Sequence, residues 1–472
     1  MKIRTQKICL LVICCSLATS SALLTHQASA TDYTWGGGDL PWTDTSGSGW
    51  NGGPPAAWVG DVATINSGIV TTTAENNENG VGIVLGGTGV LNTSGGYFAE
   101  YSSLAFVNGG TLTAVGGDAT WGAGALGSFG VSGSSTTGSV INGSFFNVWD
   151  GSTFNVADVT GNADADLTIS TLLNRITFQS SASLTKTGEG TLSLAANNVL
   201  NNLASITIAG GTLSQSTDQG WNLLNNLTLQ GSALESRLTA QSTFGCYWLT
   251  GTVTVSGSSP SSLTTNGSGA QFINLGALGS NSGSTTFNVA DVTSSSAGDL
   301  IVSTKLGNEP FGGAARLFKT GAGTMVLNAA NTYTGGTSVE AGTLQFASGS
   351  LDSTAYVGLV NSTLQWGTGN SQGLEKIFIY NGCTGTLDTN GNDVTLSAIR
   401  DNEFNHSGSL VKTGAGVLTF TGSNSYTGST TVSAGTLAAV GSWVASSGVI
   451  VESAGTLNPG TVGGIGLSLI HI

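Results

Sequence analysis

The carboxylates of this chain include two closely spaced pairs that would suit acid–base catalysis. Asp164 and Asp166 form one pair, and Asp388 and Asp393 form the other. Two carboxyl groups a few ångströms apart can hydrolyse a glycosidic bond, one as acid and the other as base or nucleophile. No Arg or Lys that could polarise a uronate substrate lies nearby in the sequence. We therefore predict that neither pair is catalytic.

One aspartate also recurs at an almost constant distance before a lysine. The distance is 19 or 20 residues in three places, namely Asp166 and Lys186, Asp299 and Lys319, and Asp393 and Lys412. An active site is not expected in triplicate within one chain. The recurrence instead favours a structural turn position.

Residues that could bind a metal are sparse. The stretch 388–393 has oxygen ligands at a spacing similar to that of a Ca²⁺ loop, but it lacks the later bidentate Glu of an EF-hand. Asp and Asn also form turns unaided. His406 is the one histidine outside the N-terminal leader and the last six residues, and we favour a turn residue there over a catalytic or zinc-binding one. We predict no catalytic residue, no metal ligand, no cofactor-binding residue and no cofactor.

Four tryptophans are concentrated near the start of the chain, at Trp35, Trp42, Trp50 and Trp58. They could stack on sugar rings, or they could cap the exposed end of a repetitive core. Terminal units of repeat proteins need atypical capping because one of their faces has no neighbour. The cap is the favoured interpretation.

The amino-acid composition indicates the fold class of the chain that carries these residues. Gly supplies 73 of 472 residues, and only 8% of residues are charged, against about a quarter in typical globular proteins. The 39% of hydrophobic residues excludes general disorder, because many of them are Val, Ile and Leu in short alternating runs. Short strands joined by Gly-rich turns are the expected structure, so the fold class is all-β.

The first thirty residues have the pattern of a secretory signal. A basic start is followed by an apolar run at 8–18 and by the small-residue cleavage pattern Ala28-Ser29-Ala30. The mature chain is expected to begin near Thr31 and to leave the cytoplasm. No later apolar segment approaches the ~20 residues of a transmembrane span.

Removal of this leader leaves nine basic residues against 26 acidic ones, a net charge of −17. Such an acidic chain is not expected to bind nucleic acid or an anionic membrane surface by electrostatics. Cys246 and Cys383 are the cysteines that remain. Buried thiols and a single bridge both stay open for them.

Internal repeats are the most informative feature. The seven residues of 154–160 return at 287–293, and downstream residues keep the 133-residue offset. A shorter module with the motif Lys-Thr-Gly-x-Gly occurs three times and begins at Leu184, Leu317 and Leu410. Two glycines between apolar alternations indicate a tight turn between two strands, and we expect positive φ at these glycines.

The second and third copies continue alike. Asn-x-Tyr-Thr-Gly begins at Asn331 and Asn424, and Gly-Thr-Leu follows at Gly342 and Gly435. The first copy lacks the tyrosine and has Asn-Asn-Val at 197–199. Each strand–turn unit cannot bury its apolar face alone, so neighbouring units must stack.

Units of this kind predict a β-solenoid with irregularly spaced repeats. Propellers and sandwiches are disfavoured, because whole coils are easily inserted in a solenoid and not in a closed ring. With about 22 residues per coil and about 4.8 Å between stacked strands, we expect about 20 coils in a rod of about 95 Å.

The module resembles the passenger-associated transport repeat, also called the autotransporter-associated β-strand repeat. The stretch 317–345 resembles this repeat at almost every position, and the stretch 410–437 resembles it nearly as well. The stretch 184–213 resembles it less closely. The resemblance implies the passenger of an autotransporter, folded as a right-handed parallel β-helix. It further implies export across the inner membrane, a place at the cell surface or outer membrane, and repeats that assist passenger folding during translocation.

Autotransporters end in a membrane β-barrel, and this sequence stops without one. Residues 467–472 break the preceding Gly-rich style, so we expect a C-terminal truncation and a non-native tail. The expected organisation is a signal peptide at 1–30, a Trp-rich N-terminal cap at 31–60, and a solenoid passenger at 61–466. The expected partners are export machinery, the missing barrel or sorting tail, and glycans or other cell-surface ligands.

A structural or adhesive surface protein, with no enzymatic activity, is the function that these features favour. Two alternatives stay open. One is an extracellular polysaccharide-active enzyme on the same fold, and the other is a surface protein with a sorting tail that is not a barrel.

Overall fold

The computed structural model of the chain describes most of the sequence after the leader. The described residues are 32–37, 39–41, 61–72, 81–94, 99–101, 103–115, 119–121, 128–175, 181–200, 203–217, 221–238, 245–267, 272–276, 283–308, 310, 313–401, 408–422, 424–440, 447–458 and 469–471. No helix occurs among them, and hence none that could span a membrane.

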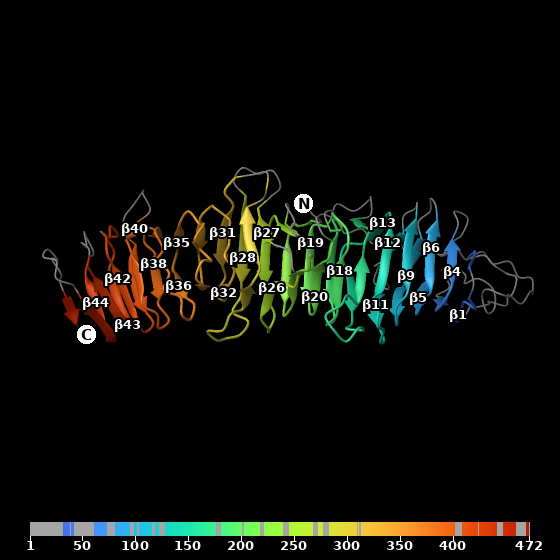
Figure 1. Ribbon diagram of the computed structural model, residues 1–472, viewed down its shortest axis with the longest axis horizontal. Helices are drawn as coiled ribbons and strands as arrows, with labels where there is room; N and C mark the ends of the chain where they lie inside the picture. The colour runs from blue at the N-terminus through green and yellow to red at the C-terminus, as the bar shows by residue number, and fades with distance from the viewer. Residues whose placement is uncertain are drawn as a thin grey trace, which may run out of the picture.

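The described residues form a rod of stacked coils in which every strand pair is parallel (Figure 1). One long sheet of 16 strands follows the rod along one side. Its strands are β1 (Asp32–Thr34), β3 (Val62–Ile65), β5 (Gly82–Gly86), β8 (Ser103–Val107), β11 (Ser128–Ser132), β14 (Ser152–Val156), β17 (Ser183–Thr187), β19 (Ser205–Ala209), β22 (Leu227–Gln230), β25 (Thr252–Val255), β28 (Ser284–Val289), β31 (Arg316–Thr320), β33 (Thr337–Val339), β35 (Val357–Leu359), β37 (Ile377–Ile379) and β40 (Ile399–Asp401).

A second sheet contains the next strand of most coils and, near residues 384–420, two strands of each coil. It contains β2 (Asp39–Pro41), β4 (Ile69–Thr72), β6 (Val90–Ser94), β9 (Thr111–Val115), β12 (Ser139–Gly143), β15 (Leu167–Ile169), β18 (Thr191–Leu194), β20 (Thr212–Gln215), β23 (Ala233–Ser236), β26 (Ser261–Thr265), β29 (Leu300–Val302), β32 (Thr324–Leu327), β34 (Thr343–Phe346), β36 (Ser362–Trp366), β38 (Thr384–Asp388), β39 (Val394–Leu396), β41 (Ser409–Thr413), β42 (Val417–Phe420), β43 (Thr430–Ala439), β44 (Val449–Asn458) and β45 (Leu469–His471).

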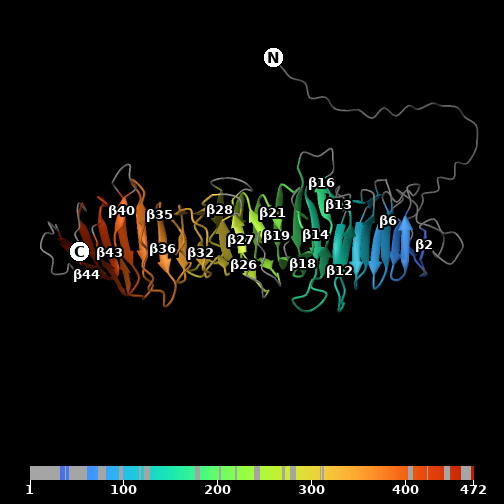
Figure 2. The same ribbon diagram turned by 45° about the horizontal axis from the view of Figure 1, so that its top comes forward.

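Two stretches of the rod have a third sheet, which the sequence did not predict (Figure 2). One comprises β7 (Ala99–Tyr101), β10 (Ala119–Trp121), β13 (Phe145–Val148) and β16 (Leu172–Arg175), and the other comprises β21 (Asn222–Leu224), β24 (Tyr247–Leu249), β27 (Phe272–Leu275) and β30 (Lys305–Asn308). Each stretch ends just before one of the Lys-Thr-Gly modules, so the 133-residue duplication includes the end of a third sheet and the module after it.

The core is a set of inward ladders formed by alternate residues of each strand. In β14 the pattern is buried, exposed, buried, exposed, buried. Phe129 and Phe154 are partners in neighbouring strands, and their rings stack with centroids 4.0 Å apart. Because each coil covers the apolar inner edge of the next, the core is continuous along the rod.

The predicted all-β solenoid is confirmed, but its coils are fewer and longer than expected. Leu344 and Leu364 are partners across neighbouring strands and mark a 20-residue coil, whereas Val253 and Phe287 mark one of 34 residues. The extra length goes into the third sheet and into loops. A single mean coil length cannot represent such insertions, and for this reason the estimate of about 20 coils was too high.

The corner glycines explain why tight turns recur at fixed places. Gly321, between β31 and β32, has φ +77°, and an added Cβ would lie 2.4 Å from the carbonyl oxygen of Val289 in the preceding coil. Gly369 has a similar φ of +75°, but nothing lies within 4 Å of its added Cβ. The first glycine is therefore required by both backbone conformation and packing, and the second by conformation alone.

We predict that Gly321→Ala destabilises the rod more than Gly369→Ala. A side chain on a residue with positive φ costs about 1–2 kcal/mol, and this cost is common to both variants. Only Gly321→Ala also introduces a steric clash with the preceding coil. Urea unfolding followed by circular dichroism would measure both variants. Equal losses would contradict the packing role of Gly321.

Candidate functional site

The lysine of each Lys-Thr-Gly module points into the core. Lys186, Lys319 and Lys412 lie in β17, β31 and β41 and have no exposed surface. In all three strands the lysine shares the inward face with the leucine two residues before it. Core lysines are rare unless their charge is satisfied.

Backbone carbonyl oxygens satisfy each ammonium group. Lys319 Nζ donates to Thr320 O at 3.0 Å, to Gly321 O at 2.8 Å and to Ala341 O at 3.0 Å. An ammonium has three N–H donors, so the three carbonyls use all of them. Two acceptors belong to the corner of the same coil, and the third belongs to the next coil. The side chain therefore ties two coils together from the inside.

The other two lysines repeat this arrangement. Lys412 Nζ donates to the carbonyl oxygens of residues 413, 414 and 434 at 2.8, 2.7 and 3.0 Å. Lys186 Nζ donates to those of residues 188 and 210 at 2.7 and 2.9 Å, with that of residue 187 at 3.5 Å. The glycine after Lys-Thr has positive φ in every copy, at 188, 321 and 414. This conformation accompanies the inward carbonyl that the lysine needs.

Burial makes these lysines easier to deprotonate. It lowers the pKa of Lys186, Lys319 and Lys412 to about 8. Nearby carboxylates oppose the effect, with Asp299 acting on Lys319 and Asp388 on Lys412. At neutral pH the ammonium form remains the main one.

The recurrent aspartate also ties neighbouring coils. Asp299 is fully buried, and its Oδ1 accepts hydrogen bonds from the N–H groups of Val292 and Thr293, both at 2.9 Å. Its Oδ2 accepts one from the N–H of Thr324, in the next coil, at 2.7 Å. A Cβ at Gly323 would lie 2.7 Å from that oxygen, so a glycine there leaves room for the carboxylate.

The same tie recurs in the other copies. Asp166 Oδ2 accepts from Thr191 N–H at 2.7 Å, and Asp393 Oδ1 accepts from Val417 N–H at 2.8 Å. The acceptor carboxylate thus always meets the first residue of the strand after the Gly-x-Gly corner. These contacts assign the aspartate a structural position, as the sequence indicated.

Asparagine and tyrosine complete the second and third copies. Asn331 Oδ1 accepts from Leu306 N–H in the preceding coil at 2.9 Å, and its Nδ2 donates to Ser350 O in the following coil at 2.9 Å. Buried Tyr333 shares a 2.8 Å hydrogen bond with Thr337. Asn331 therefore covers the end of the third sheet, where β30 has no further strand beside it.

The third copy keeps the contact with the preceding coil and the tyrosine's hydrogen bond but not the donation to the following coil, whereas the first copy replaces them. Ile399 N–H donates to Asn424 Oδ1 at 2.7 Å, and Tyr426 and Thr430 share a 2.7 Å hydrogen bond. In the first copy the buried aliphatic residues Val199 and Leu200 fill the corresponding stretch. Packing there takes the place of the tyrosine's hydrogen bond.

The two carboxylate pairs of the sequence do not form acid–base pairs through hydrogen bonds. Asp166 is buried among backbone donors, and Asp164 is exposed. Asp388 accepts from Gln365 Nε2 at 2.7 Å and from Asn390 N–H at 2.8 Å, whereas Asp393 accepts from Val417 N–H. The stretch 388–393 is thus a turn held by its own contacts. No group of three potential metal-ligating side chains occurs among the described residues.

The cysteines, the N-terminal tryptophans and His406 are the other residues that the sequence analysis singled out. Cys246 is buried and free, and Cys383 is partly exposed and free, so the open question of their pairing is answered against a bridge. Trp35 is buried in the core, and the Trp-rich cap stays a prediction. His406 and the other three N-terminal tryptophans lie outside the described residues.

Sequence reasoning did not identify the buried lysines. A usable signal was present, because Leu-x-Lys at 184–186, 317–319 and 410–412 places leucine and lysine on the same face of a strand. In a chain with only 12 basic residues, three lysines at one repeat position are not a solvated surface feature.

We predict that Lys319→Met lowers the free energy of unfolding by about 1–3 kcal/mol, because it leaves buried carbonyl oxygens without a donor. Lys376→Met is the matched control, since Lys376 is exposed. Urea unfolding and hydrogen exchange at the coil that holds Ala341 would measure the effect. A Lys319→Met variant as stable as the control would refute the role of the ammonium.

The difference in stability between the parent and Lys319→Met is expected to grow from about pH 8 to about pH 10. The pKa of Lys319 is about 8 in the folded chain and 10.5 in the unfolded chain. Between these two pH values Lys319 is therefore more protonated in the unfolded chain than in the folded one. Rising pH therefore favours the native parent. Burial raises the pKa of Cys246 and Tyr333, which act in the opposite direction, but both are present in parent and variant and cancel. Urea midpoints across this range test it, and a constant difference would contradict it.

Comparison with known proteins agrees with this geometry. The Passenger-associated-transport-repeat family matches residues 184–214, 317–346 and 410–439. These are the segments that contain the three buried lysines. No curated protein and no solved structure is significantly similar to the chain. The chain is thus a parallel β-solenoid that carries three passenger-associated transport repeats, as expected for the passenger of an autotransporter.

Proposed function

We propose that this chain is a secreted, non-enzymatic passenger that forms a structural or adhesive rod at the bacterial cell surface. The three repeats help it to fold during export. The passenger repeats and the β-solenoid support the general assignment. The family and the signal pattern at residues 1–30, which lie outside the described part of the chain, support the surface location.

The observation that carries the proposal is the set of hydrogen bonds that connect a repeat to its neighbouring coils. In the second repeat, Lys319 and Asn331 donate to the following coil, while Asn331 also accepts from the preceding one. A solenoid is stabilised mainly by contacts between adjacent units, so folding can start at any strongly coupled group of coils and spread. Three such groups along one chain suit a polypeptide that reaches the outside unfolded.

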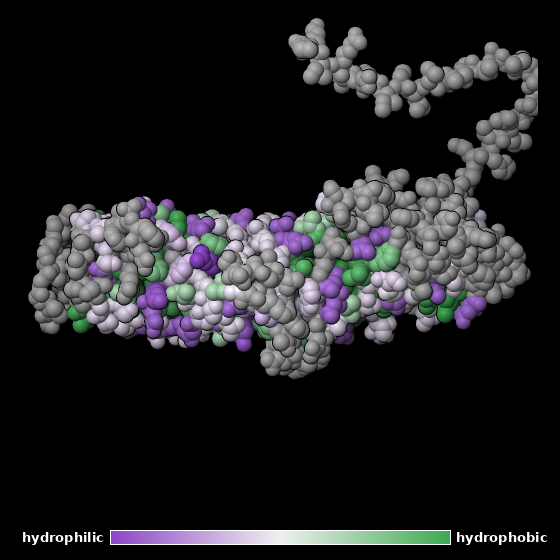
Figure 3. All heavy atoms as spheres, turned by 90° about the horizontal axis from the view of Figure 1, so that it is seen from above, coloured by the Kyte–Doolittle hydropathy of each residue, from purple (hydrophilic) through white to green (hydrophobic). Residues whose placement is uncertain are grey.

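A polysaccharide-active enzyme on the same fold is the alternative. Of the carboxylates that the sequence offered for it, Asp166 is buried, and Asp166, Asp388 and Asp393 all accept hydrogen bonds from backbone N–H groups. These groups hold turns together and are not free to reach a substrate. The surface in Figure 3 has polar and apolar residues interspersed, which suits a rod exposed to water.

Export supplies the test. In the bacterium that encodes the chain, the combined variant with methionine at positions 186, 319 and 412 is expected to reach the surface at several-fold lower levels than the parent. Surface protein would be measured by protease treatment of intact cells and by immunoblotting. A variant with methionine at Lys305 and Lys376 is the control, because neither side chain is fully buried.

Three results would contradict the proposal. Parent protein that stays inaccessible to protease in intact cells would exclude display. Equal display of the core variant and the control would show that the repeats do not assist export. Release of sugar from polysaccharides by purified parent protein would favour the enzymatic alternative.

A further inference from the structure

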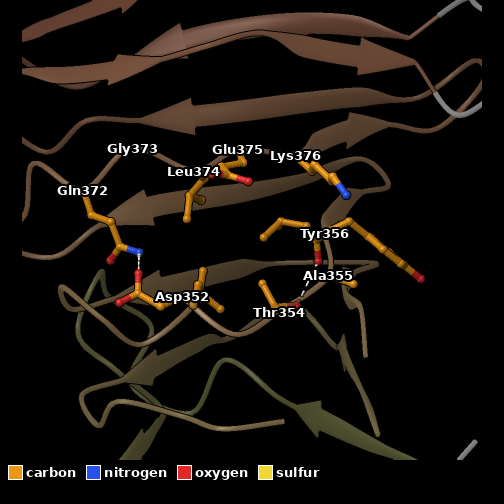
Figure 4. A pocket seen from close by; sticks show the side chains of 11 residues that line it. Asp352, Thr354, Ala355, Tyr356, Gln372, Gly373, Leu374, Glu375 and Lys376 are labelled. Carbon is orange, nitrogen blue, oxygen red and sulfur yellow. Dashed lines mark hydrogen bonds between the residues drawn. The ribbon is translucent and has the colours of Figure 1, made fainter. Parts of the chain in front are cut away.

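A hollow of about 340 Å³ lies between two coils that follow the second repeat (Figure 4). One wall is formed by residues 351–352 and 354–357, and the other by residues 372–376. The volume is near the lower end of the range for small-ligand sites, about 300–1,000 Å³. It suits one or two sugar units.

Hydrogen bonds to the repeat fix the first wall. Ser353 Oγ donates to Asn331 O at 2.8 Å or to Tyr333 O at 3.0 Å, and Thr354 Oγ1 donates to Gly335 O at 3.0 Å or to Tyr356 O at 3.0 Å. Thr337 joins the buried Tyr333 to Thr354 through hydroxyl contacts of 2.8 and 3.0 Å. The wall is therefore preorganised, which reduces the entropy lost on binding a ligand.

The lining is polar and carries both signs of charge. Asp352 accepts a hydrogen bond from Gln372 across the hollow, and Gln372 Oε1 accepts one from Gly349 N–H at 2.7 Å. Glu375 and Lys376 are exposed on the second wall (Figure 4). Two carboxylates against one ammonium disfavour a phosphate or a polyanion. Several donors and acceptors close together suit a ligand rich in hydroxyl groups.

Tyr356 adds an aromatic surface to this polar lining. Its ring meets Phe378 edge-on, with centroids 5.7 Å apart and an interplanar angle of 64°. It also lies against Gly336, where an added Cβ would be 2.0 Å from the ring carbon Cζ. A glycine in the repeat therefore provides the space that the ring occupies. Partly exposed aromatic rings beside polar groups are suited to ligands with both apolar C–H and hydroxyl faces.

We infer that this hollow binds a short, uncharged oligosaccharide, with Tyr356 stacking on one sugar ring and Asp352, Glu375 and Lys376 bonding its hydroxyl groups. The inference rests on the proposed surface function and names its partner. Sugars satisfy both the aromatic and the polar parts of the lining. A purely apolar ligand would leave the charged groups desolvated and unpaired.

The third repeat provides an internal comparison. Thr337 pairs with Val357 and Thr430 pairs with Val449, so the residues before them also correspond. Ser429 of the third repeat stands where the second has Gly336, and Gly448 of the following coil stands where Tyr356 follows the second repeat. The ring and the glycine that accommodates it are thus both absent from the third repeat, so they are not needed for the repeat to fold.

This comparison supplies two variants. Tyr356→Ala removes the ring, and Gly336→Ser introduces the third repeat's serine and displaces the ring without substituting any residue that lines the hollow. Lys305→Ala is the control, because Lys305 is on β30 and not in the lining. Thermal unfolding would establish that all three variants are folded.

The purified full chain would be tested on an array of uncharged oligosaccharides. Saturation-transfer NMR and calorimetry would then follow the best disaccharide or trisaccharide. We expect at least tenfold weaker binding by Tyr356→Ala and Gly336→Ser and unchanged binding by Lys305→Ala. No binding by the parent, or binding that survives both hollow variants, would overturn the inference. Surface display is measured separately, so a displayed chain that binds no sugar would refute this inference and leave the proposed function intact.

Discussion

The structure depends on one constraint, namely that no coil of the rod can satisfy its backbone or bury its inner face without the coils beside it. Every strand pair is parallel and joins successive coils, and inward side chains such as Phe129 and Phe154 stack in the same direction. Stability therefore accumulates along the rod, one interface at a time. Features that strengthen particular interfaces consequently have effects beyond their own coil.

The buried lysines are such features, and they have an additional consequence. Lys319 occupies an inward column between Phe287 and Val339, which are its partners in the neighbouring strands. An ammonium there is tolerated because carbonyl oxygens of two coils meet it. If the coils paired out of register, the charge would face apolar side chains with no acceptors. A buried polar group can fix register in this way, as it does in coiled coils.

The repeat thus separates two roles on one backbone. Inside, lysine, aspartate and their corner glycines are maintained at all three sites and hold neighbouring coils together. Outside, the copies diverge, with Gly336 and Tyr356 in one and Ser429 and Gly448 in another. Surface variation of this kind leaves the inner ties untouched, so one scaffold can present different surfaces along its length.

The sequence by itself determined the strand alternation, the glycine corners, the duplication and the solenoid class, because these depend on residues close together in the chain. It also marked the recurrent aspartate as structural. It did not reveal what Lys319 contacts, since Ala341 O belongs to the next coil and its position depends on how that coil closes. The third sheets and the unequal coil lengths, such as 20 and 34 residues, were likewise decided by tertiary structure. So was the hollow beside Tyr356, because loops from two separate coils must stack before its walls exist.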